Sequence, residues 1–308
     1  MSRLAELQAE LQDVSAAVAR AEHTLATHPN VPSVLATLQT IQKRRKNLEE
    51  AFAAEANLLG LDVCSYRIEP DDSQLTVHGI SEVLSSFQRL FTAVYDAVTG
   101  TPKLIARSGE EITDTTAFRF AYTFPGSLGI AMTLPNERLL AAGTQLDEAM
   151  EGVFALMRAE SPASVKTMID RFGPAAVRVA RQWASENAKA GFGADIAWRR
   201  KDEERGSVRL QKPEIARLKS VIDQTTHEEE ETFTGELTAV DTEAKTFKLR
   251  VGSRVIAGHY RDAINTVHFA SLPRQYMAAI RVTKKIIASD DSDEPTGYFL
   301  VRLTPTSL

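Results

Sequence analysis

Two runs of apolar residues, spaced alternately by three and four positions, occupy residues 1–59 and constrain the fold most strongly. The first run comprises Leu4, Leu7, Leu11, Val14, Val18, Ala21 and Leu25. This spacing is typical of the a and d positions that form the seam of a coiled coil. The segment 28–32 holds two prolines, which end the helix because their rings remove donors and disfavour helix just before them. The seam then resumes at Val34, Leu38, Ile41, Arg45, Leu48, Phe52, Glu55 and Leu59.

Residues 1–59 are therefore expected to form an antiparallel helical hairpin with a coiled-coil seam. Such a hairpin covers only one stripe of each helix, so it needs a third surface, supplied by its own chain or by other copies. We favour self-association, which makes the protein a homo-oligomer. The residues expected to carry it are Leu4, Leu7, Leu11, Val14, Val18, Leu25, Leu38, Ile41, Arg45, Leu48 and Phe52. Arg45 and Glu55 are polar seam positions, which either set the register or extend their charges to the seam edge.

Residues 60–226 mix strands and helices without regular alternation, which indicates an α+β domain with an antiparallel sheet. An alternative is two subdomains divided near Gly143. Strands are expected at 62–68, 74–78, 103–107, 117–124, 127–134, 194–200 and 207–211. Helices are expected at 81–100, 145–159, 163–171, 174–189 and 213–224. Trp183 and Trp198 have apolar neighbours and are expected in the core rather than at a partner surface.

The acidic run His227–Glu231 is the sharpest change of composition and is expected to be a solvated domain boundary. Residues 227–308 then predict a small five-stranded β-barrel, either of the oligonucleotide-binding (OB) type or SH3-like. Its strands are expected at 233–240, 246–251, 254–260, 277–289 and 298–304, with one short helix within 261–275.

The order of elements around Trp198, Val208, Leu210 and Pro213, followed by the barrel, resembles uncharacterised bacterial proteins with a mixed α+β body and a C-terminal β-barrel domain. The resemblance covers residues 75–308 and excludes the hairpin. It implies an accessory part of a bacterial multi-protein system, such as an antiviral or mobile-element system. It implies no activity and no site residues.

The net charge of −5 argues against a surface built throughout to neutralise phosphates. The barrel segment is different, because its cations lie on strands and its acids cluster in turns. Lys248 and Arg250 alternate with apolar residues and so face outward, and Arg281 and Lys285 lie on a later strand. These four residues define an alternative function, in which the outer face of the barrel binds a nucleic acid. The other interpretation is an ordinary solvated sheet face.

Motifs that carry chemistry are missing from the sequence: it has no phosphate-binding glycine loop, no HExxH and no paired CxxC. Cys64 and His78 are the one Cys/His couple, and an isolated cysteine is more often a core residue. We expect no cofactor and no metal, and we consider an enzyme less favoured than a binding protein. A single cysteine and the lack of a long apolar segment predict a cytoplasmic protein with no membrane contact.

These observations predict a non-enzymatic, oligomerising scaffold or adaptor. Its hairpin would assemble copies of the chain, and its α+β domain and barrel would face a protein partner. Nucleic-acid binding through the barrel is the alternative.

Overall fold

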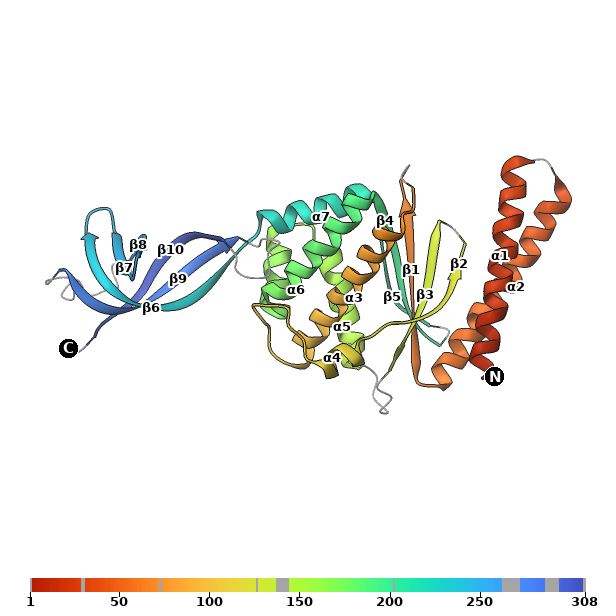
Figure 1. The fold of residues 1–308 in the computed structure, drawn as a ribbon, viewed down its shortest axis with the longest axis horizontal. Coiled ribbons are helices and arrows are strands. Elements are labelled where there is room, and N and C mark those ends of the chain that lie inside the picture. The colour runs from red at the N-terminus through yellow and green to blue at the C-terminus, as the bar shows by residue number, and fades with distance from the viewer. Residues whose placement is uncertain are drawn as a thin grey trace. The chain divides into compact units, whose positions relative to one another are not determined.

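The computed structural model contains an antiparallel β-sheet, a closed five-stranded barrel and, within the described residues, seven helices (Figure 1). The predicted α+β class and the predicted five-stranded barrel are confirmed. The chain forms two compact units, Met1–Ile222 and Asp223–Leu308. The predicted boundaries after residues 59 and 226 stay predictions. The structure describes residues 2–28, 31–71, 74–125, 127–136, 144–201, 203–261, 272–285 and 294–306.

The sheet of the N-terminal unit has the strand order β2-β3-β1-β4-β5, and all neighbouring strands are antiparallel. The strands are β1 (Leu61–Pro70), β2 (Arg119–Phe124), β3 (Leu128–Pro135), β4 (Phe192–Arg200) and β5 (Glu203–Leu210). Gly129 on β3 meets the ring of Phe124, where an added Cβ would lie 2.2 Å from a ring carbon. A glycine is required there because any side chain would displace the ring. β1 is the central strand and supplies side chains to both faces of the sheet.

Three helices cover one face of the sheet (Figure 1): α3 (Val77–Thr99), α5 (Gln145–Met157) and α6 (Pro162–Ala190). Trp183 and Trp198 are buried in this layer, so the core placement predicted for both is confirmed. The Trp183 indole donates a hydrogen bond to the Tyr66 hydroxyl at 3.1 Å. α6 combines the two helices expected at 163–171 and 174–189. It kinks at Gly173, whose φ of 80° is open to glycine but strained for other residues.

The helical hairpin lies on the opposite face of the sheet (Figure 1). Its helices are α1 (Arg3–Thr27) and α2 (Pro32–Leu58), as predicted. The end of the hairpin nearest the N-terminus shares one apolar core with the sheet. That core comprises Leu7, Leu11, Phe52, Ala53 and Ala56 from the hairpin and Val63, Ala121, Tyr122 and Ala131 from the sheet. The chain itself thus supplies a third surface for the proximal half of the hairpin.

Two predicted strands of this unit are wrong. Residues 74–76 have no regular structure and α3 begins at Val77, because the Thr76 hydroxyl accepts the Gly79 N–H and caps the helix. Residues 103–107 form no strand. Lys103 instead binds Asp96 at 2.6 Å and its carbonyl accepts the Ala175 N–H, so the segment is held against α3 and α6. A short helix that was not predicted, α4 (Glu110–Thr115), follows.

The C-terminal unit is a closed barrel with the strand order β10-β8-β7-β6-β9. α7 (Lys212–Gln224) precedes β6 (Thr226–Asp241), β7 (Thr246–Val251), β8 (Arg254–Tyr260), β9 (Arg274–Lys285) and β10 (Glu294–Pro305). β10 pairs with β8 in parallel, and the other pairs are antiparallel. The barrel interior is filled by apolar side chains, with Phe247, Tyr276 and Ile280 at most 1% exposed. The helix expected within 261–275 and the last residues of the strand expected at 277–289 lie largely outside the described residues.

The acidic run at 227–231 lies near the start of the second unit, but it is not wholly solvated, since His227 is buried and Glu229 is half-buried. It forms the first part of β6 and pairs with β9 in register. Glu229 and Glu231 lie on one side of the strand and both bind Lys284, at 2.8 and 2.6 Å. Burial would raise the pKa of Glu229, but the hydrogen bonds from Lys284 and His227 outweigh it and lower that pKa. A strand tolerates this run because its carboxylates are paired across the ladder.

Candidate functional site

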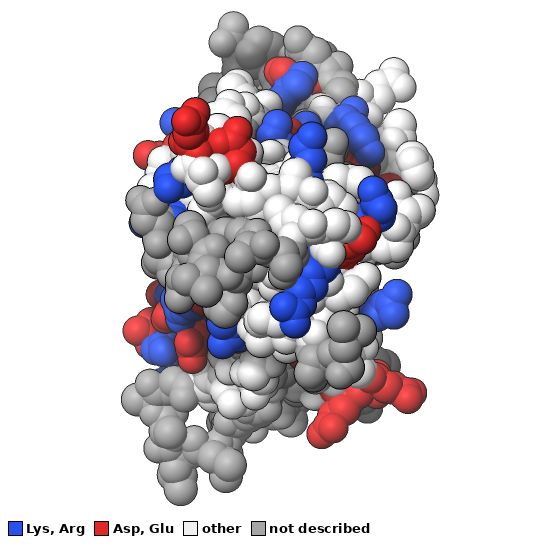
Figure 2. Space-filling model, turned by 90° about the vertical axis from the view of Figure 1, so that its left-hand side faces the viewer, with Lys and Arg blue, Asp and Glu red and all other residues white. Residues whose placement is uncertain are grey.

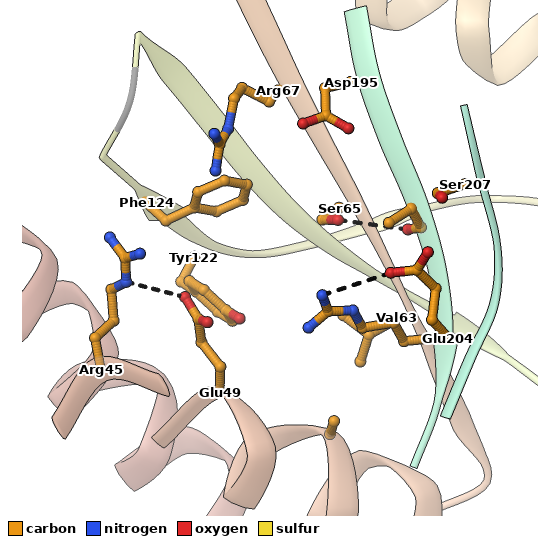
Figure 3. Close-up of a pocket in the computed structure, with 13 residues that line it drawn as sticks. Arg45, Glu49, Val63, Ser65, Arg67, Tyr122, Phe124, Asp195, Glu204 and Ser207 are labelled. Atoms are coloured by element: carbon orange, nitrogen blue, oxygen red, sulfur yellow. Dashed lines mark hydrogen bonds and ion pairs between the residues drawn. The ribbon is translucent and has the colours of Figure 1, made fainter. Parts of the chain in front are cut away.

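A polar cavity of about 270 Å³ lies between α2 and the face of the sheet that the hairpin covers (Figure 3). Alternate residues of β1 line it, because successive side chains of a strand point to opposite faces. Val63, Ser65 and Arg67 therefore face the cavity, whereas Cys64, Tyr66 and Ile68 are buried on the other face. The remaining lining residues are Arg45, Glu49 and Ala53 of α2, Tyr122 and Phe124 of β2, Asp195, Ala197 and Arg199 of β4, and Glu204 and Ser207 of β5.

Three arginines and three carboxylates line this cavity, and four of these six groups are paired with each other. The Arg45 Nε lies 3.3 Å from Glu49, and the Arg199 guanidinium lies 3.8 Å from Glu204. Arg67 and Asp195 are the other two. They are direct cross-strand partners of β1 and β4, yet within the described residues neither side chain has an ion pair.

The Arg67 guanidinium stacks over the ring of Phe124, 5.3 Å from its centroid. Its Nε is buried and has no hydrogen-bond partner in the described part of the chain. Figure 3 shows the Arg67 side chain extending over the ring of Phe124, with Asp195 on the neighbouring strand. An arginine stays charged at any physiological pH, so an unpaired donor at a buried Nε is costly.

Two titratable groups at the cavity have a raised pKa. Burial raises the pKa of Glu49, although Arg45, Arg199 and Arg67 act in the opposite direction. Burial also raises the pKa of Tyr122, so its phenol is protonated and available as a donor near neutral pH. These groups can orient a small polar molecule by hydrogen bonds and ion pairs. The described residues contain no cluster of histidine, cysteine and acidic side chains that fits a metal ion.

Cys64 is fully buried, and burial raises the pKa of its thiol. A buried thiol is protonated near neutral pH and is a poor nucleophile. His78 lies exposed in the first turn of α3. Cys64 is therefore a core residue, in agreement with the interpretation favoured from the sequence.

A second polar cluster lies among the buried residues of the sheet and α5. Arg200 donates two hydrogen bonds to Asp62, at 2.9 and 2.6 Å, and two to Asp147, both at 2.9 Å. Asp62 is fully buried and Asp147 is 6% exposed. Burial would raise the pKa of Asp147, but the Thr144 N–H and Arg200 outweigh it and lower that pKa. Asp147 also belongs to the capping box of α5, so Arg200 ties this helix to two strands.

The residues predicted for oligomerisation divide into two groups by burial. Five are buried: Leu7, Leu11, Val14, Val18 and Phe52. Six are half-buried: Leu4, Leu25, Leu38, Ile41, Arg45 and Leu48. The polar seam residue Arg45 lines the cavity beside the sheet, a position that its spacing along α2 alone does not reveal.

The four cations predicted for nucleic-acid binding are all exposed, but they lie on two strands that are not neighbours. Lys248 and Arg250 lie on one face of β7, whereas Arg281 and Lys285 lie on β9, with β6 between the two strands. Arg250 binds Glu236 at 3.1 Å and Arg281 binds Glu228 at 3.7 Å. Figure 2 shows basic side chains scattered among uncharged and acidic ones on the face that it presents.

Arg67, Asp195, Arg199, Glu204 and Tyr122 were not identified as site residues from the sequence. The one local signal is the alternation of Val63, Ser65 and Arg67, which places a serine and an arginine on the same face of a strand as a valine. Comparison with models of protein families, with curated proteins and with solved structures finds no match to this chain. Among the described helices, none is long and apolar enough to cross a membrane.

Proposed function

We propose that this protein is a non-enzymatic adaptor that self-associates through the distal half of its helical hairpin. The observation that carries the proposal is the change in burial along the seam. Leu7, Leu11 and Phe52 near the base are at most 2% exposed. Leu25, Leu38 and Ile41 belong to the same seam but are only half-buried, whereas Val18 of that seam is fully buried.

The distal half extends away from the rest of the N-terminal unit in Figure 1. A shallow groove of about 360 Å³ runs between its two helices. The residues that line it are Ala17, Arg20, Ala21 and Thr24 of α1 and Ser33, Val34, Thr37 and Ile41 of α2. The half-buried seam residues Leu25, Leu38 and Ile41 suit packing against a second hairpin of the same kind. Symmetric pairing of identical surfaces is the commonest form of oligomer. We therefore propose a second copy of this chain as the occupant.

Sedimentation velocity of the full-length protein tests this proposal. We expect wild type to form a dimer or larger oligomer, and Leu38→Glu to dissociate because the new carboxylate would be buried without a partner. Gln39→Glu is the matched control. It adds the same charge one position away, and Gln39 is exposed, so the new carboxylate stays in water. A wild type that sediments as a monomer over the whole concentration range, or a Leu38→Glu variant that stays assembled, would contradict self-association.

A second proposed function is nucleic-acid binding by the barrel, which we infer to be of the OB type. The supporting observation is the connectivity. β6 pairs with both β7 and β9, and the parallel pair among the described strands joins β8 to β10. In OB barrels the second and third strands form the ligand-binding face. These strands correspond to β7 and β8 here.

The outer face of β7 and β8 combines cations with apolar and aromatic groups. Lys248 is the cross-strand partner of Ala257, and Arg250 is the partner of Val255, which is 54% exposed. His259 is exposed on the same face and pairs with Phe299 of β10. Cations that follow a phosphate backbone and rings that stack on bases are the two elements of single-strand binding.

Fluorescence anisotropy with a labelled oligothymidylate at low salt tests this second function. We expect binding that weakens as salt is added, and a clear loss of affinity in the double variant Lys248→Glu, Arg250→Glu. Arg281→Glu is the control, since Arg281 lies on β9, outside the proposed face. Absence of binding at low salt, or an equal loss in the control, would exclude the β7–β8 face as a nucleic-acid site.

A further inference from the structure

We propose that the cavity between α2 and the sheet binds a small zwitterion, a molecule of amino-acid size with one carboxylate and one ammonium group. The carboxylate would bind Arg67 and the ammonium would bind Asp195. This inference is independent of self-association and of nucleic-acid binding, because it concerns a different surface of the chain.

The anionic half of the ligand is inferred from Arg67. Its guanidinium has five donors in a fixed, planar arrangement that matches a carboxylate. Within the described residues it stacks on Phe124 and attracts Glu49 electrostatically, but it forms no ion pair and its buried Nε lacks an acceptor. Protein interiors rarely leave a buried donor of this kind unsatisfied. A carboxylate in the cavity would supply the missing acceptor.

The cationic half is inferred from Asp195. Opposite charges directly across two antiparallel strands ordinarily attract each other. Arg67 and Asp195 hold such positions, yet no ion pair joins them. The other charges at the cavity form ion pairs, Arg45 with Glu49 and Arg199 with Glu204, although the buried Arg45 Nε makes no hydrogen bond within the described residues either. The unmet charge of the cavity is therefore one positive and one negative group on adjacent strands, which a zwitterion complements.

The dimensions and the walls of the cavity agree with this class of ligand. Its volume of about 270 Å³ lies just below the usual range for cavities that hold drug-sized molecules, so it suits a smaller ligand. Ser65, Ser207 and the protonated Tyr122 phenol offer further hydrogen bonds, while Val63 and Phe124 offer apolar contacts. Because α2 forms one wall and the sheet the other, a bound ligand would connect the hairpin to the sheet.

Ligand-observed saturation-transfer NMR on the full-length protein tests the proposal. The probes are the proteinogenic α-amino acids, β-alanine and 4-aminobutyrate, each compared with its N-acetyl and methyl-ester derivatives. We expect at least one zwitterion to bind and both of its derivatives, which lack one charge, to bind at least tenfold more weakly. Failure of every zwitterion to bind, or equal binding of an N-acetyl derivative, would overturn the proposal.

Variants locate the binding to this cavity. Arg67→Gln and Asp195→Asn are each expected to weaken binding of the zwitterion at least tenfold. Asp195→Asn keeps the shape of the side chain, so its folding is expected to be intact, as thermal unfolding would verify. Arg209→Gln is the control, because Arg209 is exposed on β5, is paired with Glu69 and does not line the cavity. Unchanged affinity in both cavity variants would place the ligand elsewhere and overturn the assignment.

Discussion

Replacing Arg200 with methionine is expected to lower the free energy of unfolding by about 3–5 kcal/mol, the cost of removing one member of a buried ion pair. The variant would leave Asp62 and Asp147 buried and close together without their shared cation. It would also remove the ion pairs that join Asp62 of β1 and Asp147 of α5 through one side chain of β4, leaving the Trp198 indole as a donor to Asp147 at 3.4 Å. Chemical denaturation at neutral pH measures the loss.

Arg199→Met is the matched control for this prediction. Arg199 is the preceding residue of β4, but it is about half exposed and lies 3.8 Å from Glu204, so its loss is expected to cost less than about 1 kcal/mol. Arg200 helps to lower the pKa of Asp147 in the wild type, so the difference between wild type and Arg200→Met should shrink as the pH is lowered and Asp147 takes up a proton. Equal stability of wild type and Arg200→Met at neutral pH would show that the cluster does not stabilise the fold.

Replacing Phe52 with alanine is expected to cost about 3–5 kcal/mol, as for other buried phenylalanines. Phe52 is 1% exposed and meets Tyr122 edge-on, with ring centroids 5.1 Å apart. The cavity left behind would weaken the packing of α2 against the sheet. Denaturation measures the energy, and hydrogen exchange should show reduced protection of α1 and α2 in particular.

Phe120→Ala is the control for the Phe52 substitution, since Phe120 lies on β2 and is 59% exposed. We expect its effect to stay within about 0.5 kcal/mol. If Phe52→Ala were as mild as this control, or if hydrogen exchange in α1 and α2 were unchanged, the hairpin would not be docked on the sheet as described.

Much of the secondary structure was predictable from local periodicity. The alternation of three and four residues predicted both helices of the hairpin, and the alternation of two predicted the barrel strands between 233 and 260. Local patterns failed where a tertiary contact decided the outcome. Residues 103–107 read as a strand, but the ion pair between Lys103 and Asp96 holds them against helices.

The strand at 227–231 was not predicted, for a related reason. Four consecutive glutamates indicate a solvated segment when only their own charge is considered. Lys284, more than 50 residues later in the sequence, pairs with two of them across the strands. A neutralising partner at that separation cannot be read from composition.

The candidate site depended still more on the tertiary structure. Its six charged groups come from one helix and three strands, and none of them lies in a recognisable motif. Arg45 was identified as a polar residue of the seam, but its location beside the cavity follows from how α2 lies on the sheet. Arg67 and Asp195 become neighbours only because β1 and β4 pair in one register.

The sequence by itself determined the α+β class, the helical hairpin and the small barrel, because apolar periodicity states which side of an element must be covered. The tertiary structure alone decided what covers it. The sheet of the same chain covers the end of the hairpin nearest the N-terminus. Leu25, Leu38 and Ile41 in the distal half are only half-buried. Periodicity carries no information about the surface that covers the apolar residues. Burial of an apolar stripe is equally favourable against the chain's own sheet or against a second copy, because the hydrophobic effect is not directional.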